Sequence, residues 1–195
     1  MGFSVAMTIL FMHVIPCWFL IKYIKNKYHQ NIHYLGISFK NFFRKILMGL
    51  SGYIMCYPYI LASLVISFLV LELFKQKAVP HPLVPVVLKE TSSIDMGYFL
   101  FLSTIIGPIA EEIFFRGILY PLLKKRVGII IAAIVSSLFF SAMHMNLGLF
   151  LGVFVLGLLF TYLYEKTGSI LPGMFVHVMH NALMMALVML IKKLI

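Results

Sequence analysis

The sequence predicts an all-α fold, a polytopic bundle of transmembrane helices. Three observations lead to this prediction: 62% of the 195 residues are hydrophobic, only 11% are charged, and the mean hydropathy is +1.02. Soluble domains are about 45–50% apolar and about 25% charged. The chain has more apolar surface than a water-soluble globule buries, so we expect an integral, multi-pass membrane protein.

Charge-free stretches locate the expected spans, because a spanning helix needs about 20 apolar residues. Residues 1–21 and 46–71 carry no charge. Residues 127–164 are long enough for two spans, with a turn at Asn146-Leu147-Gly148, and residues 167–191 allow a last one. With a further span through the acidic pair described below, we expect about six spans, at residues 3–21, 46–71, 97–123, 128–145, 148–164 and 170–191.

The chain is expected to have two parts. Residues 1–95 would hold the first two spans, a basic interfacial segment and a periplasmic-side loop, and residues 96–195 the remaining spans. The basic loops place residues 22–45 in the cytoplasm by the positive-inside rule.

The formal net charge of +10 raises the question of nucleic-acid binding. The basic residues, however, lie between apolar runs and form no solvated basic face. We therefore expect membrane lipids as partners and no nucleic acid.

Ionisable residues inside the expected spans are the candidate functional groups. Insertion scales assign a charge at the bilayer centre a cost of about 2.5–3.5 kcal/mol, so such residues are rare without a role. The candidates are Glu111, Glu112 and Arg116 in the third span, His144 in the fourth, and His177 and Asn181 in the sixth. His180 is expected to be structural.

Helical phase separates the two glutamates. Glu112 and Arg116 stand at positions i and i+4, about 40° apart, and are expected to form an ion pair. Glu111 lies about 140° from Arg116 and is expected to lack its own counter-ion. Such a desolvated carboxylate can take a proton from water as a general base. The alternative is a protonated Glu111 that only hydrogen-bonds to a neighbouring helix.

Local sequence features add two expectations. Gly107-Pro108 disfavours a regular helix and frees backbone carbonyls just before the acidic pair. His177 and Asn181 share a helix face, and His144 follows Phe140 at the same spacing. A lone intramembrane histidine is more often a partner in an inter-helix hydrogen bond than a ligand. The HExxH motif of zinc proteases is absent from the sequence.

Three short motifs carry a family resemblance. EExxxR stands at Glu111–Arg116, FxxxH at Phe140–His144 and HxxxN at His177–Asn181. In this order, on separate spans, they resemble the CPBP (CAAX protease and bacteriocin-processing, or Abi) family of intramembrane proteases. The resemblance covers about residues 97–190 and would make residues 96–195 the catalytic helix bundle. The family commonly has more than six spans, so the resemblance also implies a broken or re-entrant helix near residues 82–88.

The resemblance implies hydrolysis of a peptide bond without a covalent intermediate. Glu111 resembles the water-activating carboxylate, assisted by His144. His177 and Asn181 resemble the groups that stabilise the oxyanion, and Glu112 and Arg116 resemble their supporting pair. Two alternatives stay open for the cofactor: a Zn²⁺ ion held by Glu111, His144 and His177, or no metal.

The function implied is that of an intramembrane endopeptidase, a hydrolase with a peptide or membrane-protein substrate. Its expected setting is bacteriocin or peptide maturation, or self-immunity, in a bacterial plasma membrane. One alternative is a non-catalytic membrane immunity or scaffolding protein with the same fold. A proton-coupled transporter is another, since Glu and His inside a membrane also form proton relays.

Overall fold

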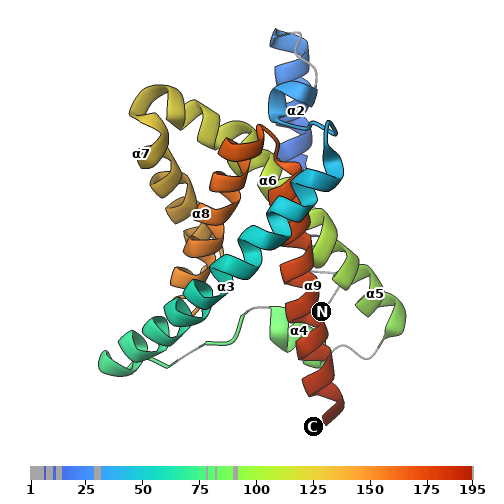
Figure 1. Ribbon diagram of the computed structural model, residues 1–195. Helices are drawn as coiled ribbons and strands as arrows, with labels where there is room; N and C mark the ends of the chain where they lie inside the picture. The colour runs from blue at the N-terminus through green and yellow to red at the C-terminus, as the bar shows by residue number, and fades with distance from the viewer. Residues whose placement is uncertain are drawn as a thin grey trace.

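All regular elements that the structure describes are helices, which confirms the predicted all-α class (Figure 1). The structure is a computed structural model, and it describes residues 15–28, 32–77, 79–81, 83–89 and 92–194, with the single positions Met7 and Phe11. Its helices are α2 (Ile15–Tyr28), η2 (Ile32–Leu35), α3 (Phe42–Leu73), α4 (Leu83–Lys89), α5 (Ser93–Phe101), η3 (Leu102–Ile106), α6 (Gly107–Glu112), η4 (Ile113–Leu119), α7 (Tyr120–Met143), α8 (Phe150–Thr167) and α9 (Leu171–Leu194).

Four helical stretches in the described residues are long and apolar enough to cross a membrane. They are Phe42–Leu73, Ile94–Met143, Phe150–Thr167 and Leu171–Leu194. The helices expected at 46–71, 148–164 and 170–191 are thereby confirmed as α3, α8 and α9.

The expected count of six spans is not supported. Most of the span expected at 3–21 falls outside the described residues. The spans expected at 97–123 and 128–145 lie in one helical stretch of 50 residues, Ile94–Met143. The basic run Lys124-Lys125-Arg126, which we expect to follow the third span, is itself helical and ends two residues before a break in the helix.

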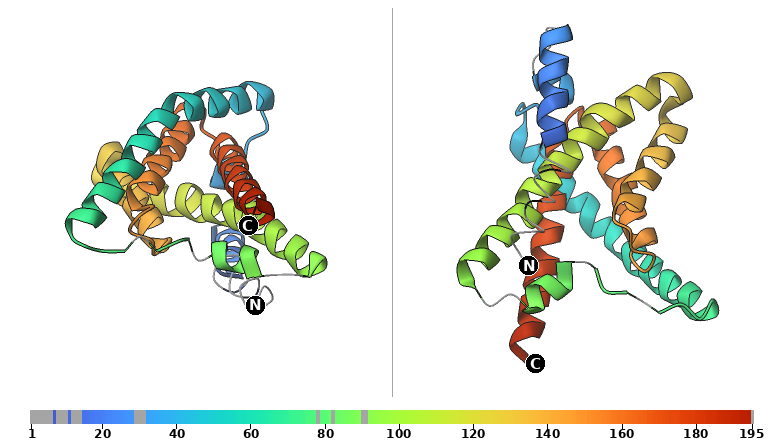
Figure 2. Two further views of the ribbon diagram at one scale, coloured as in Figure 1. Left: turned by 90° about the horizontal axis from the view of Figure 1, so that it is seen from below. Right: turned by 180° about the vertical axis from the view of Figure 1, so that it is seen from behind.

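The interruption in this long stretch lies at Gly128. Its backbone angles, φ 79° and ψ 175°, are not helical, and only glycine adopts such a positive φ at little cost. The chain turns back here, so that the second half of α7 descends beside the segment that leads up to it (Figures 1 and 2). The stretch therefore consists of two arms joined by a sharp turn.

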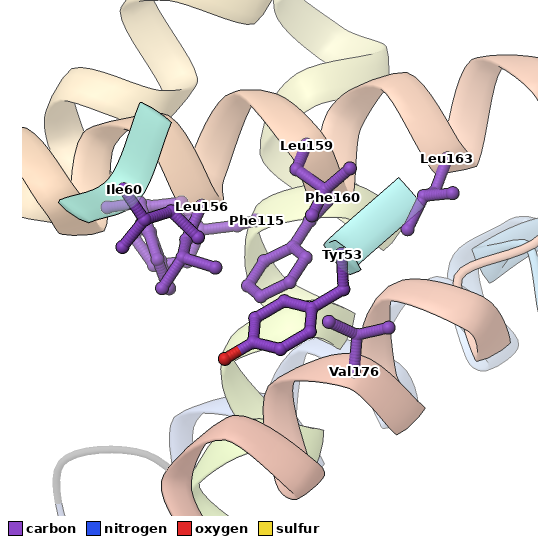
Figure 3. Packing of buried hydrophobic residues seen from close by; sticks show 9 residues of the cluster. Tyr53, Ile60, Phe115, Leu156, Leu159, Phe160, Leu163 and Val176 are labelled. Carbon is purple, nitrogen blue, oxygen red and sulfur yellow. The ribbon is translucent and has the colours of Figure 1, made fainter. Parts of the chain in front are cut away.

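A shared apolar core joins helices that are distant in sequence. α3 packs against α8 and α9, and α8 packs against α7. The first core cluster contains Tyr53, Ile60, Phe115, Phe140, Leu156, Leu159, Phe160, Leu163 and Val176 (Figure 3). Because α3 belongs to this core, the N-terminal part of the chain supports the C-terminal bundle; a domain boundary at residue 95 stays a prediction.

A short helix occupies the region where we expected a broken or re-entrant segment. α4 has seven residues, about 10 Å of helix, which is too short to cross a bilayer. Its Val86 and Val87 are buried in a second cluster with Phe99 and Met185. Lys192 also donates a hydrogen bond to the carbonyl of Val87, at 2.8 Å. α4 is thus held against α9, and its re-entrant character stays a prediction.

Candidate functional site

The two glutamates stand on a short α-helical segment between two π-helical ones. α6 has six residues, and the π-helices η3 and η4 lie directly before and after it. Pro108 stands at the start of α6 inside a continuous helical stretch, where it cannot donate the backbone hydrogen bond of a regular helix. The irregularity expected at Gly107-Pro108 is therefore confirmed. π-helical turns often occur at functional sites, because they shift side chains out of regular register.

Glu112 and Arg116 form the expected ion pair. Arg116 Nη1 donates to Glu112 Oε1 at 2.7 Å, and both side chains are 0% exposed. Arg116 Nη2 donates to the backbone carbonyl of Gly157 at 3.0 Å, which ties the pair to α8. Two opposite charges that are buried together with additional hydrogen bonds avoid the much larger cost of a single buried charge.

Three aromatic rings surround the Arg116 guanidinium. Its central carbon lies 4.5 Å from the ring centre of Phe140, 5.2 Å from Phe160 and 5.7 Å from Phe115. Cation–π attraction is strongest for such desolvated cations. Phe140, the first residue of the FxxxH motif, therefore contacts the supporting arginine and not only the histidine that follows it.

His177 lies between the two carboxylates. Its Nδ1 is 3.3 Å from Glu112 Oε1, and its Nε2 is 3.6 Å from Glu111 Oε2. The imidazole stacks on Phe160, with ring centres 5.0 Å apart and an angle of 28°. α9 brings a histidine next to Glu111, but the imidazole is a counter-ion only when it is protonated, so the absence of a counter-ion of its own for Glu111 stays a prediction. Helical phase along α6 alone could not reveal this contact between helices.

α9 approaches the acidic pair closely at a glycine. A Cβ atom at Gly173 would lie 3.3 Å from Glu112 Oε2, closer than most real contacts of a Cβ atom. Gly173 stands four residues before His177 on the same face of α9. The absence of a side chain there lets the helix lie against the carboxylate and bring the imidazole into reach.

His144 is the residue that ends α7. Its Nδ1 lies 2.9 Å from the carbonyl oxygen of Phe140, and its ring stands edge-on to the Phe140 ring. A carbonyl oxygen only accepts hydrogen bonds, so Nδ1 must carry the proton. In the neutral ring Nε2 then carries the lone pair, which is the form that can accept a proton.

The Asn181 amide is engaged with the first π-helix. Asn181 Nδ2 donates to the backbone carbonyl of Ser103, in η3, at 3.4 Å. This contact positions η3 against α9. The role of Asn181 in stabilising an oxyanion stays a prediction.

Sequence analysis missed His81, a fourth histidine near the site. Asn146 Nδ2 donates to the carbonyl of Val79 at 2.9 Å, which fastens the loop before α4 beside the end of α7. Burial lowers the pKa of His81, His144 lowers it further, and the Glu111 carboxylate acts in the opposite direction. The sequence offers one hint of this position for His81: Asn146, which holds the loop, stands two residues after His144.

The donor set for a metal is not assembled as expected. Among the described residues, no group of three or more His, Cys, Asp and Glu side chains is placed to hold a metal ion. Glu111 and His177 are neighbours, but a site formed with His144 would need a different arrangement of these side chains. The choice between Zn²⁺ and no metal stays a prediction.

Comparisons with known proteins confirm the family resemblance. Residues 94–183 match the family model of type II CAAX prenyl endopeptidase Rce1-like proteins. The chain is also similar to a protein of Bacillus subtilis (strain 168) named "Putative membrane peptidase YdiL", with 35% identity over 82 residues. This alignment covers 42% of the chain and 34% of the relative, so about a third of the relative's length. No solved structure matches the chain.

The matched region contains the whole predicted site. Glu111, Glu112, Arg116, His144, His177 and Asn181 all lie between residues 94 and 183. α3 lies outside it, although α3 packs against α8 and α9. The family match therefore covers the region that carries the charged groups. It does not cover α3, whose contribution is seen only in the structure.

Proposed function

We propose that this chain is a membrane peptidase that hydrolyses a peptide bond with a water molecule activated by Glu111. One observation carries the proposal: two adjacent buried or nearly buried carboxylates have different environments. Glu112 is 0% exposed and bound to Arg116, whereas Glu111 is 18% exposed and faces His177. The first is held as a structural anion, and the second can exchange a proton.

The proposed reaction begins with proton transfer from water to Glu111. The resulting hydroxide attacks the carbonyl carbon of the scissile bond and forms a tetrahedral oxyanion. The proton then passes from Glu111 to the amide nitrogen, the C–N bond breaks, and a carboxylic acid and an amine leave the site. Water supplies every atom that is added, so the reaction needs no further reactant.

The histidines support this reaction from two sides. His144, with Nδ1 bound to the Phe140 carbonyl, presents Nε2 as an acceptor that assists deprotonation of the water. His177 lies between both carboxylates and, when protonated, moderates the repulsion between them. Arg116 acts through Glu112 and does not need to touch the substrate.

The family match supports a peptide or membrane-protein substrate, and it motivates the probes. Purified protein in liposomes would be incubated with a farnesylated peptide that ends in a CAAX sequence, with its unprenylated form, and with a peptide mixture from digested membrane proteins. Mass spectrometry would identify cleaved bonds. We expect cleavage of at least one probe; no cleavage of any probe would contradict the proposal.

The decisive variant is Glu111→Gln, which keeps the shape of the side chain and removes the base. A general base contributes about 10²–10⁴-fold, so we expect a loss of that size with normal expression. The matched control is Glu72→Gln, the same change at the exposed end of α3. Substantial activity in purified Glu111→Gln would overturn the assignment of the base.

Bacteriocin or peptide maturation, or self-immunity, in a bacterial plasma membrane is the setting that the resemblance supports. In producing cells, a catalytic role predicts that Glu111→Gln loses the protective or maturation phenotype while protein levels persist. A phenotype that survives this substitution would favour the non-catalytic immunity or scaffolding alternative.

A further inference from the structure

A tyrosine and a histidine from different helices form a hydrogen-bonded pair near the site. Tyr53 Oη on α3 lies 2.8 Å from His180 Nδ1 on α9. Their rings meet edge-on, with centres 5.8 Å apart and an angle of 71°. The family match begins at residue 94, after the end of α3, so it assigns no role to Tyr53.

The pair adjoins the proposed catalytic groups. His180 follows His177 by one helical turn, and both His177 and His144 are close enough to act on it electrostatically. Tyr53 packs in the same core cluster as Phe160, the ring on which His177 stacks. Figure 3 shows the Tyr53 ring between Phe160 and Val176, with its hydroxyl oxygen on the side away from Leu163.

The surroundings of Tyr53 decide which group donates. Tyr53 is only 6% exposed and is packed among apolar side chains of the first core cluster. A buried phenol needs an acceptor for its proton, and His180 Nδ1 is the acceptor that it meets. When the hydroxyl donates to Nδ1, the neutral ring must carry its own proton on Nε2.

The two expected donors, His177 and Asn181, both lie against protein groups, so a further N–H would add to what they can offer an oxyanion. Both ring nitrogens of His177 face carboxylates, Nδ1 toward Glu112 and Nε2 toward Glu111. The amide of Asn181 donates to the Ser103 carbonyl. A group that stabilises an oxyanion must instead aim an N–H at the oxygen of the reacting carbonyl.

We propose that Tyr53 is a positioning residue of the peptidase site, which holds His180 with its proton on Nε2 so that this nitrogen donates a hydrogen bond to the substrate carbonyl oxygen. This inference rests on the proposed function. In this inference His180 contacts the substrate. Tyr53, on α3, does not touch the substrate and acts only by positioning His180.

The test combines Tyr53→Phe with a matched control, Tyr57→Phe. Tyr57 lies one turn further along α3, and its ring is 5.8 Å from that of Tyr53. Nitrogen-15 NMR of labelled histidine in liposomes reports the tautomer of His180 without any substrate. We expect the Nε2–H tautomer in the wild type and in Tyr57→Phe, and a mixture of tautomers in Tyr53→Phe.

Kinetics provide the second readout. Tyr53→Phe should lower kcat about tenfold and leave KM nearly unchanged, because it weakens a contact made mainly in the transition state. His180→Gln retains an N–H near the position of Nε2, so it should be more active than His180→Ala. In the His180→Gln background the further change Tyr53→Phe should alter kcat less than twofold.

The outcomes separate this inference from the proposed function. If the wild type cleaves peptides but Tyr53→Phe matches Tyr57→Phe in tautomer and kcat, this inference alone is overturned. Absence of peptidase activity in the wild type overturns both. A thermal unfolding curve for each variant shows whether a loss of kcat reflects loss of fold, and a folded Tyr53→Phe with wild-type kcat would refute the role of Tyr53.

Discussion

Two ion pairs in this molecule have the same length and very different surroundings. Glu112–Arg116 and Lys124–Glu165 each join nitrogen and oxygen at 2.7 Å. Both side chains of the first pair are 0% exposed, whereas Lys124 is 38% and Glu165 22% exposed. The distance between the charges therefore says little about what each pair does for the protein.

The difference lies in what replaces water around the charges. The buried pair is completed by the Gly157 carbonyl, by aromatic rings on Arg116 and by His177 beside Glu112. The second pair, which is only partly exposed, joins the beginning of α7 to the end of α8, where solvent can reach either charge. Removing one partner of the first pair leaves a buried charge without an opposite charge. Removing one partner of the second leaves a charge that water can solvate.

The largest effect is expected from breaking the buried pair. Arg116→Met leaves the Glu112 carboxylate buried without its cation, and Glu112→Gln leaves Arg116 without its anion. Removing one partner of a buried pair costs about 3–5 kcal/mol, so each variant should unfold at a much lower temperature in detergent. Glu111→Gln should change the unfolding temperature much less. Unfolding temperatures of Arg116→Met and Glu112→Gln close to wild type would contradict the burial argument.

A smaller effect is expected from changing the aromatic surroundings of the buried cation. Phe140→Leu keeps an apolar side chain but removes the ring that lies 4.5 Å from the guanidinium. A desolvated cation–π contact is worth about 2 kcal/mol, and the smaller side chain also loses packing in the core, so the free energy of unfolding should fall by at least about 2 kcal/mol. The control is Phe139→Leu, the same change at the exposed neighbouring position. Equal effects of the two variants would show that the contact with Arg116 contributes nothing.

Breaking the exposed pair should have the smallest effect on stability. Exposed salt bridges contribute about 0.2–1 kcal/mol, so Lys124→Met should lower the free energy of unfolding by no more than this. Raising the salt concentration to about 1 M should reduce the difference between Lys124→Met and wild type, because the Debye length falls to about 3 Å. The effect of Arg116→Met should persist in the same salt. If the difference in unfolding free energy between Lys124→Met and wild type does not change with salt, the Lys124–Glu165 pair behaves like the buried pair and this prediction is wrong.

Removal of metal ions should produce no change. A divalent cation bound at Glu111 and His177 would place positive charge beside the Glu112–Arg116 pair and change the electrostatic surroundings of that pair. Since the described side chains gather no set of three ligands, we expect peptidase activity and unfolding temperature to survive a strong chelator. Metal analysis of purified protein checks the same point. One zinc ion per chain, lost together with activity, would establish the zinc alternative for Glu111, His144 and His177.

Features that depend on neighbours along one helix could be predicted from the sequence. The Glu112–Arg116 pair follows from the i, i+4 spacing, and it appears as expected. The irregular backbone next to Gly107-Pro108 follows from the two residues themselves, and the π-helix Leu102–Ile106 ends directly before them. The three long helices α3, α8 and α9 follow from uninterrupted apolar stretches.

Features that depend on contacts between helices could not be predicted. His177 is 66 residues from Glu111 in the chain, and only the packing of α9 on α6 brings it within 3.6 Å. His81 and Tyr53 carried no motif, and each approaches the site from an element that the motifs do not include. The number of spans stays a prediction, because charge marks where a helix can leave the bilayer, whereas the position of the turn, at Gly128, is a property of the folded backbone.

The sequence by itself determined the class of the protein, its helical membrane character, the buried acidic and basic pair and the family motifs. These depend on composition and on spacings within one helix, which the regular geometry of an α-helix converts into positions. Only the tertiary structure decided which side chains surround Glu111, which ring lies on Arg116 and which hydroxyl orients His180. Those contacts depend on how closely and at what angle the helices pack. Small residues such as Gly173 allow a close approach, but their role can be recognised only when the surface that they face is known.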